Sequence, residues 1–301
     1  MLLYDEIIVP LVTYCKEKYP DSFIFGMTTN TTLLYKERVD FLYDNNIFPL
    51  LSIDGIKSTQ DYNRPCRDGT SSFDKVYANL PYILEKMPNL AFRSTIYQDT
   101  VNETFKNYLF AEKIGFKNYY TMPNCREKWT EENKEILKKE IKKIFLYQID
   151  KFLNNELPMN FSRINDTFNN ILKQDIGTVS NNYYNFSPSI REVARCGLGT
   201  VGGSIAYDGT IYGCQEQDSH GKDKIFMIGN IYNGGINKEL HEKLLKTISI
   251  STSPICDNEQ LCNNCSLYKI CHFYCGLNCP SESYDLFNNF NTQPEMGCFW
   301  H

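Results

Sequence analysis

The sequence predicts an α/β chain in which βα units with a parallel sheet precede a small cysteine-rich domain containing a β-hairpin. Short apolar runs alternate with amphipathic stretches through the first 155 residues, which is the pattern of strands buried in a parallel sheet. Of the twelve cysteines, nine lie between Cys196 and Cys298. The pair Asp208-Gly209 separates two runs of strand-forming residues, and this is a strong hairpin signal.

Composition limits the class of protein. The 301 residues are 42% hydrophobic and 22% charged, with a formal net charge of −5, which excludes disordered and collagen-like chains. The mild acidity provides no basic face for nucleic acid. No apolar run reaches the ~20 residues of a membrane-spanning helix, and Asp5 and Glu6 fall where a signal peptide would be apolar. We therefore expect a cytoplasmic protein that binds neither nucleic acid nor membrane.

The elements of the first half follow from periodicity. A leading helix has apolar side chains at helical spacing from Ile7 to Cys15. The expected strands are 23–27, 47–53, 90–97 and 116–122. The expected helices between them are 36–46, 72–86 and 102–114. Ser72 is the expected N-cap of the second of these helices, and Pro81 should interrupt it.

A longer helix is expected over 131–155, ended by Pro158. Its expected apolar side consists of Leu137, Ile141, Ile144, Phe145 and Phe152. We interpret the Asn-rich range 156–195 as a connector. The hairpin strands are expected at 204–207 and 210–212, and a further strand at 225–231; the remainder is expected to be cysteine-bearing loop.

The cysteines indicate a metal site. Thiolates this dense repel one another and oxidise unless a cation holds them. Zinc accepts four thiolates in closed sites, and Cys262 and Cys265 would fit half of a zinc ribbon. Iron–sulfur clusters take four thiolates from loops of this kind.

The spacing resembles the SPASM domain, which carries auxiliary clusters in many radical S-adenosylmethionine (SAM) enzymes. That signature reads C-x9–15-G-x4-C, a gap, C-x2-C-x5-C-x3-C, a gap and C. Its glycine matches Gly209. Its seven cysteines match Cys196, Cys214, Cys262, Cys265, Cys271, Cys275 and Cys298. The resemblance implies two auxiliary [4Fe–4S] clusters.

The first half resembles the radical SAM barrel. Residues 28–34 read Thr-Thr-Asn-Thr-Thr-Leu-Leu and are similar to the family's TNGTLL strand end, with Thr31 replacing the usual glycine. Residues 52–55 read Ser-Ile-Asp-Gly, with Asp61 and Arg64 downstream, and resemble the family's SxDG…D..R segment. The resemblance implies a partial (β/α)6 barrel in which Asn30, Ser52, Asp54 and Arg64 bind SAM. Ligands of parallel sheets do bind at the carboxyl ends of strands.

The most important departure of the chain from the family concerns the catalytic cluster. The CxxxCxxC motif of the catalytic cluster and the GGEP-type segment are absent from these 301 residues. We therefore interpret the chain as resembling a radical SAM/SPASM protein that lacks its first two βα units. Such a chain should not generate the 5′-deoxyadenosyl radical. The expected domains are a partial barrel at 1–155, the connector, and a SPASM domain at 196–301.

The family pattern also implies how the ligands divide. Cys262, Cys265, Cys271 and Cys298 would hold the distal cluster, and Cys196, Cys214 and Cys275 the cluster nearer the barrel. The fourth ligand of the cluster nearer the barrel would be Cys256, which we favour, Cys279, or a cysteine of the substrate.

The resemblance implies maturation of a ribosomally made peptide by thioether cross-linking of cysteine. Residues 271–280 and the Gly-Cys-Phe-Trp ending are similar to the peptide-maturase branch, and more narrowly to enzymes acting on CxxxC-repeat precursors. The implied partners are a cysteine-containing precursor peptide and a reductant protein for the clusters. The alternatives are sulfatase maturation and a non-catalytic protein that binds clusters or peptide.

Overall fold

A computed structural model of the chain describes residues 3–162, 164–165, 198–200, 202–217, 224–251, 284 and 296. The chain separates into two compact units, Met1–Asn169 and Asn170–His301. The first unit contains a parallel sheet and the second an antiparallel one. Both expected sheets are therefore confirmed. Among the described residues, no helix has the length and apolar character needed to cross a bilayer.

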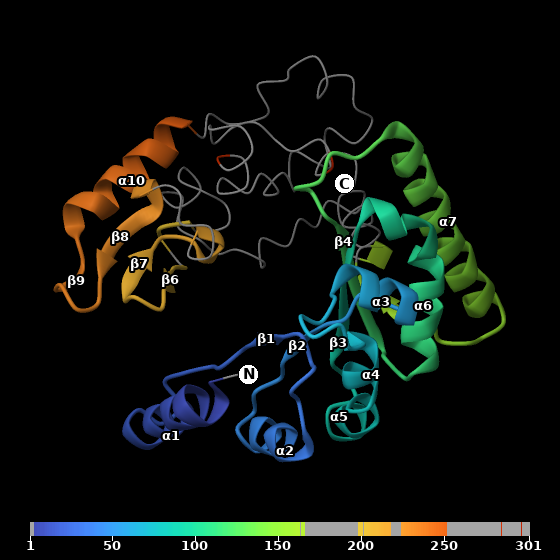
Figure 1. The fold of residues 1–301 in the computed structure, drawn as a ribbon, viewed down its shortest axis with the longest axis horizontal. Helices are drawn as coiled ribbons and strands as arrows, with labels where there is room; N and C mark the ends of the chain where they lie inside the picture. The colour runs from blue at the N-terminus through green and yellow to red at the C-terminus, as the bar shows by residue number, and fades with distance from the viewer. Residues whose placement is uncertain are drawn as a thin grey trace, which may run out of the picture. The chain divides into compact units, whose positions relative to one another are not determined.

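The sheet of the first unit has five strands in the order of the chain (Figure 1). They are β1 (Thr28–Thr29), β2 (Leu50–Ser52), β3 (Ala91–Ile96), β4 (Asn118–Pro123) and β5 (Asn160–Phe161). Every neighbouring pair is parallel. Each crossover thus advances by one strand in the same direction, as in a (β/α) barrel, whereas a doubly wound sheet reverses its strand order.

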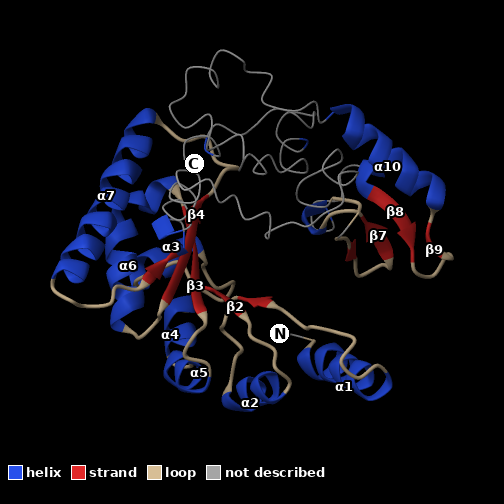
Figure 2. Ribbon diagram, turned by 180° about the vertical axis from the view of Figure 1, so that it is seen from behind, coloured by secondary structure: helices blue, strands red, loops and turns tan. Residues whose placement is uncertain are grey.

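The helices of the first unit connect these strands. The chain begins with a π-helix, η1 (Tyr4–Ile8), that continues into α1 (Val9–Lys18), and a 3-10 helix, η2 (Gln98–Glu103), leads into α6. The remaining helices are α2 (Lys36–Asp44), α3 (Lys57–Asn63), α4 (Ser72–Tyr77), α5 (Leu80–Lys86), α6 (Thr104–Lys113) and α7 (Glu131–Leu153). Figure 2 shows α6 and α7 on one side of β3 and β4.

Aromatic packing defines the helix-covered face of this sheet. The Tyr108 ring of α6 meets the Tyr119 ring of β4 edge-on at 5.3 Å. Tyr119 also stacks on Phe92 of β3 and contacts Phe161 of β5. All four side chains are almost fully buried. Burial of such rings is the main source of stability for this face.

The opposite face of the sheet is polar and partly exposed. Burial alternates along β3, so that Phe92, Ser94 and Ile96 are buried and Arg93 is half-buried. The parallel register aligns Arg93 with Ser52 of β2 and with Tyr120 of β4. Because aligned residues of neighbouring strands point to the same face, these three side chains share one face, with Ser52 buried and Tyr120 exposed; we call it the uncovered face because it lies opposite the face on which α6 packs in the described part of the chain.

The first strand does not lie where the sequence predicts it. Pairing begins where the Leu50 N–H donates to the Met27 carbonyl at 2.8 Å, and β1 follows it. Within the expected range 23–27, Phe23 and Ile24 are 53% and 102% exposed. Phe23 packs against Tyr19, just after α1, and not against the sheet.

The expected helix over 72–86 is divided as the proline predicts. Helix α4 ends at Tyr77, and Pro81 lies in the first turn of α5. The expected N-cap is wrong by one residue, because the Ser71 hydroxyl accepts the Asp74 N–H at 3.0 Å. Ser72 is instead a buried residue of the first turn.

Helix α7 forms where it is expected, but its buried face is more polar than its sequence pattern indicates. Phe145 and Phe152 are 43% and 74% exposed, contrary to the expectation. Glu140 is buried because its carboxylate accepts the Phe105 N–H at 3.0 Å. Gln148 is buried because its amide donates to the Met159 carbonyl at 2.8 Å. Strand β5 lies within 156–195, a range for which the sequence predicts no strand.

The second unit contains the expected hairpin. Strands β6 (Ser204–Ile205) and β7 (Thr210–Tyr212) pair antiparallel, and β8 (Met227–Asn230) and β9 (Gly235–Ile236) extend the sheet. Gly209 has φ of 81° in the hairpin turn, a conformation that glycine adopts without steric cost.

Helix α10 (Lys238–Ser251) follows β9, in a range for which the sequence predicts loop. The helix forms here because it completes a small core. Leu244 is 1% exposed and packs with Leu198, Phe226 and Ile228. Two 3-10 turns, η4 (Gln215–Gln217) and η5 (Lys224–Phe226), lie between β7 and β8.

Candidate functional site

The four residues predicted to bind SAM lie at or beyond the carboxyl ends of β1 and β2. Asn30 directly follows β1, and Ser52 is the last residue of β2. Asp54 comes two residues later, and Arg64 directly follows α3. Because β1 and β2 are parallel neighbours, their ends meet at one edge of the sheet.

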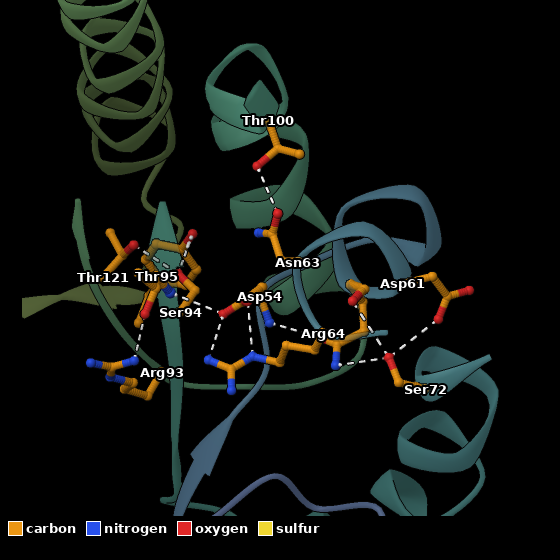
Figure 3. A network of polar contacts seen from close by, with 12 residues as sticks. Asp54, Asp61, Asn63, Arg64, Ser72, Arg93, Ser94, Thr95, Thr100 and Thr121 are labelled. Carbon is orange, nitrogen blue, oxygen red and sulfur yellow. Dashed lines mark hydrogen bonds and ion pairs between the residues drawn. The ribbon is translucent and has the colours of Figure 1, made fainter. Parts of the chain in front are cut away.

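Asp54 is the centre of a hydrogen-bonded network (Figure 3). Its side chain is fully buried, and the Arg64 side chain is 26% exposed. The Arg64 Nε and NH2 groups donate to the two carboxylate oxygens at 2.8 and 3.1 Å. The Thr95 N–H of β3 donates to the Asp54 carboxylate at 3.0 Å. Charge-assisted fork contacts of this kind are strong and geometrically specific.

The backbone around Asp54 is equally constrained. The Asp54 N–H donates to the Gln60 side-chain carbonyl at 2.8 Å, and Gln60 is 1% exposed. The Ile56 N–H donates to the Asn107 side-chain carbonyl of α6 at 3.0 Å. At Gly55, which has φ of 155°, an added Cβ would lie 2.0 Å from the same Asn107 oxygen. The glycine of the Ser-Ile-Asp-Gly segment is therefore required by close approach.

Asp61 links α3 to the start of α4. Its carboxylate accepts the Phe73 N–H at 2.8 Å and the Ser71 hydroxyl at 2.8 Å, and it pairs with Lys57 at 3.3 Å. Burial raises the pKa of the Asp61 carboxyl, but the hydrogen bonds from Phe73 and Ser71 and the Lys57 charge outweigh it, so the pKa is lowered. Asp61 thereby positions the helix pair beside the site.

The end of β1 is less constrained. The exposed Asn30 accepts the Thr32 hydroxyl at 3.0 Å. Thr31 is 0% exposed and has φ of 69°. Its N–H donates to the Thr29 hydroxyl at 3.2 Å, whereas its own buried hydroxyl has no hydrogen-bond partner. The threonine thus adopts the left-handed conformation that suits the glycine of the family pattern.

Sequence reasoning missed the polar residues of β3. Arg93 NH1 donates to the Thr95 hydroxyl at 2.6 Å, and NH2 contacts the Met122 sulfur of β4 at 3.7 Å. Tyr97, directly after β3, has its pKa raised by burial and by the Asp54 charge. The available signal was the alternation of Arg93, Thr95 and Tyr97 within an apolar strand, which places them on one face.

Of the predicted metal ligands, the structure describes Cys214 alone. It follows β7, is half-buried and packs against the core around Phe226. The others, Cys196, Cys256, Cys262, Cys265, Cys271, Cys275 and Cys298, lie outside the described residues, as does Cys279. In the part of the chain that is described, His, Cys, Asp and Glu side chains form no group of three or more that could hold a metal.

Comparison with known proteins yields matches to solved structures. No protein-family model and no curated protein matches the sequence. The fold superposes on hexahistidine-tagged anSMEcpe with bound SAM at a TM-score of 0.68 and 18% identity, over 97% of this chain and 72% of that one. For anSMEcpe with bound SAM and the Cp18Cys peptide, the TM-score is 0.67 at 16% identity, over 97% and 76% of the two chains.

A second protein has a similar fold. Streptococcus suis SuiB bound to SAM matches at a TM-score of 0.53 and 16% identity, over 96% of this chain and 62% of that one. Both neighbours are radical SAM enzymes. The resemblance drawn from the sequence motifs is therefore confirmed at the level of fold.

Proposed function

We propose that this chain carries the SAM-binding and peptide-binding parts of a radical SAM/SPASM-type peptide maturase, and that the cross-link formed is a thioether to a substrate cysteine. The observation that carries the proposal is the cluster of Asn30, Ser52 and Asp54 at one edge of a parallel sheet whose fold matches two SAM-bound enzymes. The peptide complex of anSMEcpe supports a peptide as the second ligand.

The predicted cofactor residues divide into two roles. Asn30 is exposed, and Ser52, which is 7% exposed, lies on the same face of the sheet as Arg93, so both would contact SAM directly. Both carboxylate oxygens of Asp54 already accept protein hydrogen bonds. Asp54 and Arg64 would therefore act as positioning residues that fix the loop after β2, which keeps the ligand-facing groups in place.

Two auxiliary [4Fe–4S] clusters fit the donor set of the second half. The thiolate donors are present in the SPASM spacing, and Cys214 lies at the hairpin end as that pattern requires. Cys262, Cys265, Cys271 and Cys298 would hold one cluster, and Cys196, Cys214 and Cys275 the other, with Cys256 as the favoured fourth ligand. When bound, such clusters supply one-electron transfer, for which a reductant protein would be the partner.

The fourth position of the second cluster distinguishes two uses of that site. If Cys256 or Cys279 occupies it, the site is closed. If neither does, a substrate cysteine could bind there as thiolate, since a cluster iron lowers the pKa of a thiol. The distances from both cysteine sulfurs to the iron atoms, in a crystal structure of the reconstituted protein, decide between them.

The experiment that tests the proposal is anaerobic reconstitution followed by metal, sulfide and SAM-binding assays. We expect a brown protein with roughly eight iron and eight sulfide per chain, the content of two [4Fe–4S] clusters. Cys265→Ala should lose roughly half of the iron because one ligand set is broken, and Cys66→Ala, outside the motif, should lose none. A colourless protein with stoichiometric zinc would contradict the cluster assignment.

SAM binding is measured on the same protein. Ser52→Ala should weaken the binding of SAM, whereas the exposed loop change Asp68→Ala should not. Under strong reductant, the chain of 301 residues should release no 5′-deoxyadenosine, because CxxxCxxC is absent from it. Failure to bind SAM would favour the alternative of a non-catalytic protein that binds clusters or peptide.

Sulfatase maturation is the second candidate activity. It is favoured by the TM-score of 0.68 with anSMEcpe, against 0.53 with SuiB. The two activities differ in product: sulfatase maturation oxidises one residue, whereas cross-linking joins two. Mass spectrometry of a peptide treated with a protein that also contains CxxxCxxC separates them, because a cross-link survives proteolysis between the joined residues.

A further inference from the structure

The guanidinium of Arg93 has an unusual environment. It lies on the uncovered, polar face of the sheet, between Ser52 and Tyr120 in the register of β2, β3 and β4. Its contacts are the Thr95 hydroxyl and the Met122 sulfur, and neither carries charge. In the described part of the chain, no carboxylate forms an ion pair with it.

Other arginines of this unit show what a satisfied guanidinium looks like here. Arg64 forms a bidentate contact with Asp54. Arg38 lies near the Asp5 carboxylate at 3.8 Å and over the Tyr4 ring at 4.7 Å. A half-buried arginine without such a partner is already partly desolvated, and it therefore attracts an anion more strongly than a surface arginine does.

The direction of the Arg93 side chain indicates which ligand would supply the anion. Its NH2 group reaches β4 at Met122, away from Ser52 and Asp54. In Figure 3 the guanidinium groups of Arg93 and Arg64 lie on opposite sides of β3. The predicted SAM residues are at β1 and β2, so Arg93 faces the other part of the surface.

That other part has the character of a peptide-binding surface. Tyr120 is 43% exposed on the same face. Asn118 of β4 is aligned with Asn160 of β5 and accepts its side-chain amide at 3.1 Å. Polar, partly exposed groups thus lie beside Arg93 on β4, at Tyr120, and two residues toward the amino ends of β4 and β5, at Asn118 and Asn160, a span that an extended chain can cover.

We infer that Arg93 is a specificity-determining residue that binds a carboxylate side chain, Asp or Glu, at a fixed distance from the reacting cysteine of the peptide. The inference rests on the proposed function and deepens it. Arginine suits this task because its planar fork matches the two oxygens of a carboxylate. The substrates would be acidic cysteine peptides.

The test uses the full chain, reconstituted and immobilised under anaerobic conditions. The probe is a library of octapeptides with blocked ends, one fixed cysteine and otherwise random positions, and a matched library has serine in place of the cysteine. Retained peptides are sequenced by mass spectrometry. Because the ends are blocked, every carboxylate in the probe is an Asp or Glu side chain.

We expect the cysteine library to be retained over the serine library, with Asp or Glu enriched over Asn or Gln roughly tenfold at one position, as for a hydrogen-bonded charge. Arg93→Gln should remove that enrichment while cysteine peptides are still retained. Arg93→Lys should keep part of it, and the exposed control Arg67→Gln all of it. Thermal unfolding of each variant verifies that it is folded.

The remaining outcomes overturn the inference in distinguishable ways. Cysteine peptides retained without an acidic preference, or with a preference that Arg93→Gln leaves unchanged, contradict the role of Arg93 and leave the proposed function intact. Retention of neither library above a blank surface contradicts the peptide binding on which the proposed function depends. If added SAM abolishes the acidic preference of the unsubstituted protein, Arg93 binds the SAM carboxylate and the assignment to peptide is wrong.

Discussion

The loops that follow β1 and β2 lie side by side at the predicted site, yet they are built in opposite ways. After β2, the Asp54 carboxylate and main chain are held by Arg64, Gln60 and Thr95. After β1, Thr31 has a strained backbone and a buried hydroxyl without a partner. One loop is fixed by a satisfied network, and the other stores conformational energy.

The difference shows how a site can combine rigidity with local strain. Fully satisfied buried networks specify one geometry, which suits a loop whose purpose is to position others. Left-handed backbone at a β-branched residue costs roughly 1–2 kcal/mol, and such strain concentrates at functional sites. The strain at Thr31 is directly beside Asn30, which we propose to contact SAM.

The largest expected effect comes from breaking the β2 network. Asp54→Ala leaves the Arg64 charge and the Thr95 N–H without their partner, and removal of one member of a buried pair costs about 3 kcal/mol or more. Urea unfolding measures this loss. The control is Asp68→Ala, which removes an exposed ion pair with Lys75 and exposed hydrogen bonds from Thr70 and should cost clearly less, because exposed ion pairs contribute little to stability. Equal losses in both variants would show that the β2 loop is no better fixed than the surface.

The sequence predicts these two loops to different depths. The positions of Ser52 and Asp54 at a strand end follow from an apolar run and turn residues, which are local signals, whereas the apolar run before Asn30 does not form the strand that it predicts. The family pattern assigns both Asp54 and Arg64 to SAM binding, and it does not predict the ion pair between them. The contact between the Asp54 carboxylate and the Thr95 N–H depends on the alignment of β2 with β3. Because Asp54 and Thr95 are 41 positions apart in the sequence, no local pattern encodes this contact.

The same limit explains the errors elsewhere in the molecule. Apolar periodicity on α7 predicts Phe152 as buried, but tertiary contacts bury Glu140 and Gln148 instead, because each has a hydrogen-bond partner on α6. Helix α10 has 14 residues and is longer than α2 or α6, but it was missed because it lies between cysteine-bearing segments that indicate loop. Arg93 was missed because alternation places it on one face with Thr95 and Tyr97 but does not tell which face of the sheet the helices cover.

A smaller effect, of opposite sign, should come from relieving the β1 strain. Thr31→Gly removes both the left-handed β-branched residue and the unpaired hydroxyl, and the added flexibility of glycine in the unfolded chain offsets part of this gain. We expect a net stabilisation of about 1 kcal/mol in urea unfolding. The matched control is Thr32→Gly, where the backbone is unstrained and glycine should destabilise by about 1 kcal/mol. If both substitutions destabilise, the strain at Thr31 does not exist in solution.

The smallest expected effect is a difference in acid sensitivity between the two loops. The pKa of the Asp61 carboxyl is lowered from 3.8 in the folded chain: burial raises it, but the Phe73 N–H, the Ser71 hydroxyl and the Lys57 charge outweigh burial. A folded-state pKa below the unfolded value means that the stabilisation is fully present above pH 3.8 and is lost as the pH falls through the folded pKa. Asp61→Asn cannot titrate, so its unfolding temperature should fall less steeply than that of the unsubstituted protein as the pH drops below 3.8. Thr31→Gly introduces no titrating group and should keep the original slope. If the unfolding temperatures of Asp61→Asn and of the unsubstituted protein fall in parallel with pH, Asp61 is not the group that makes the region after β2 sensitive to acid.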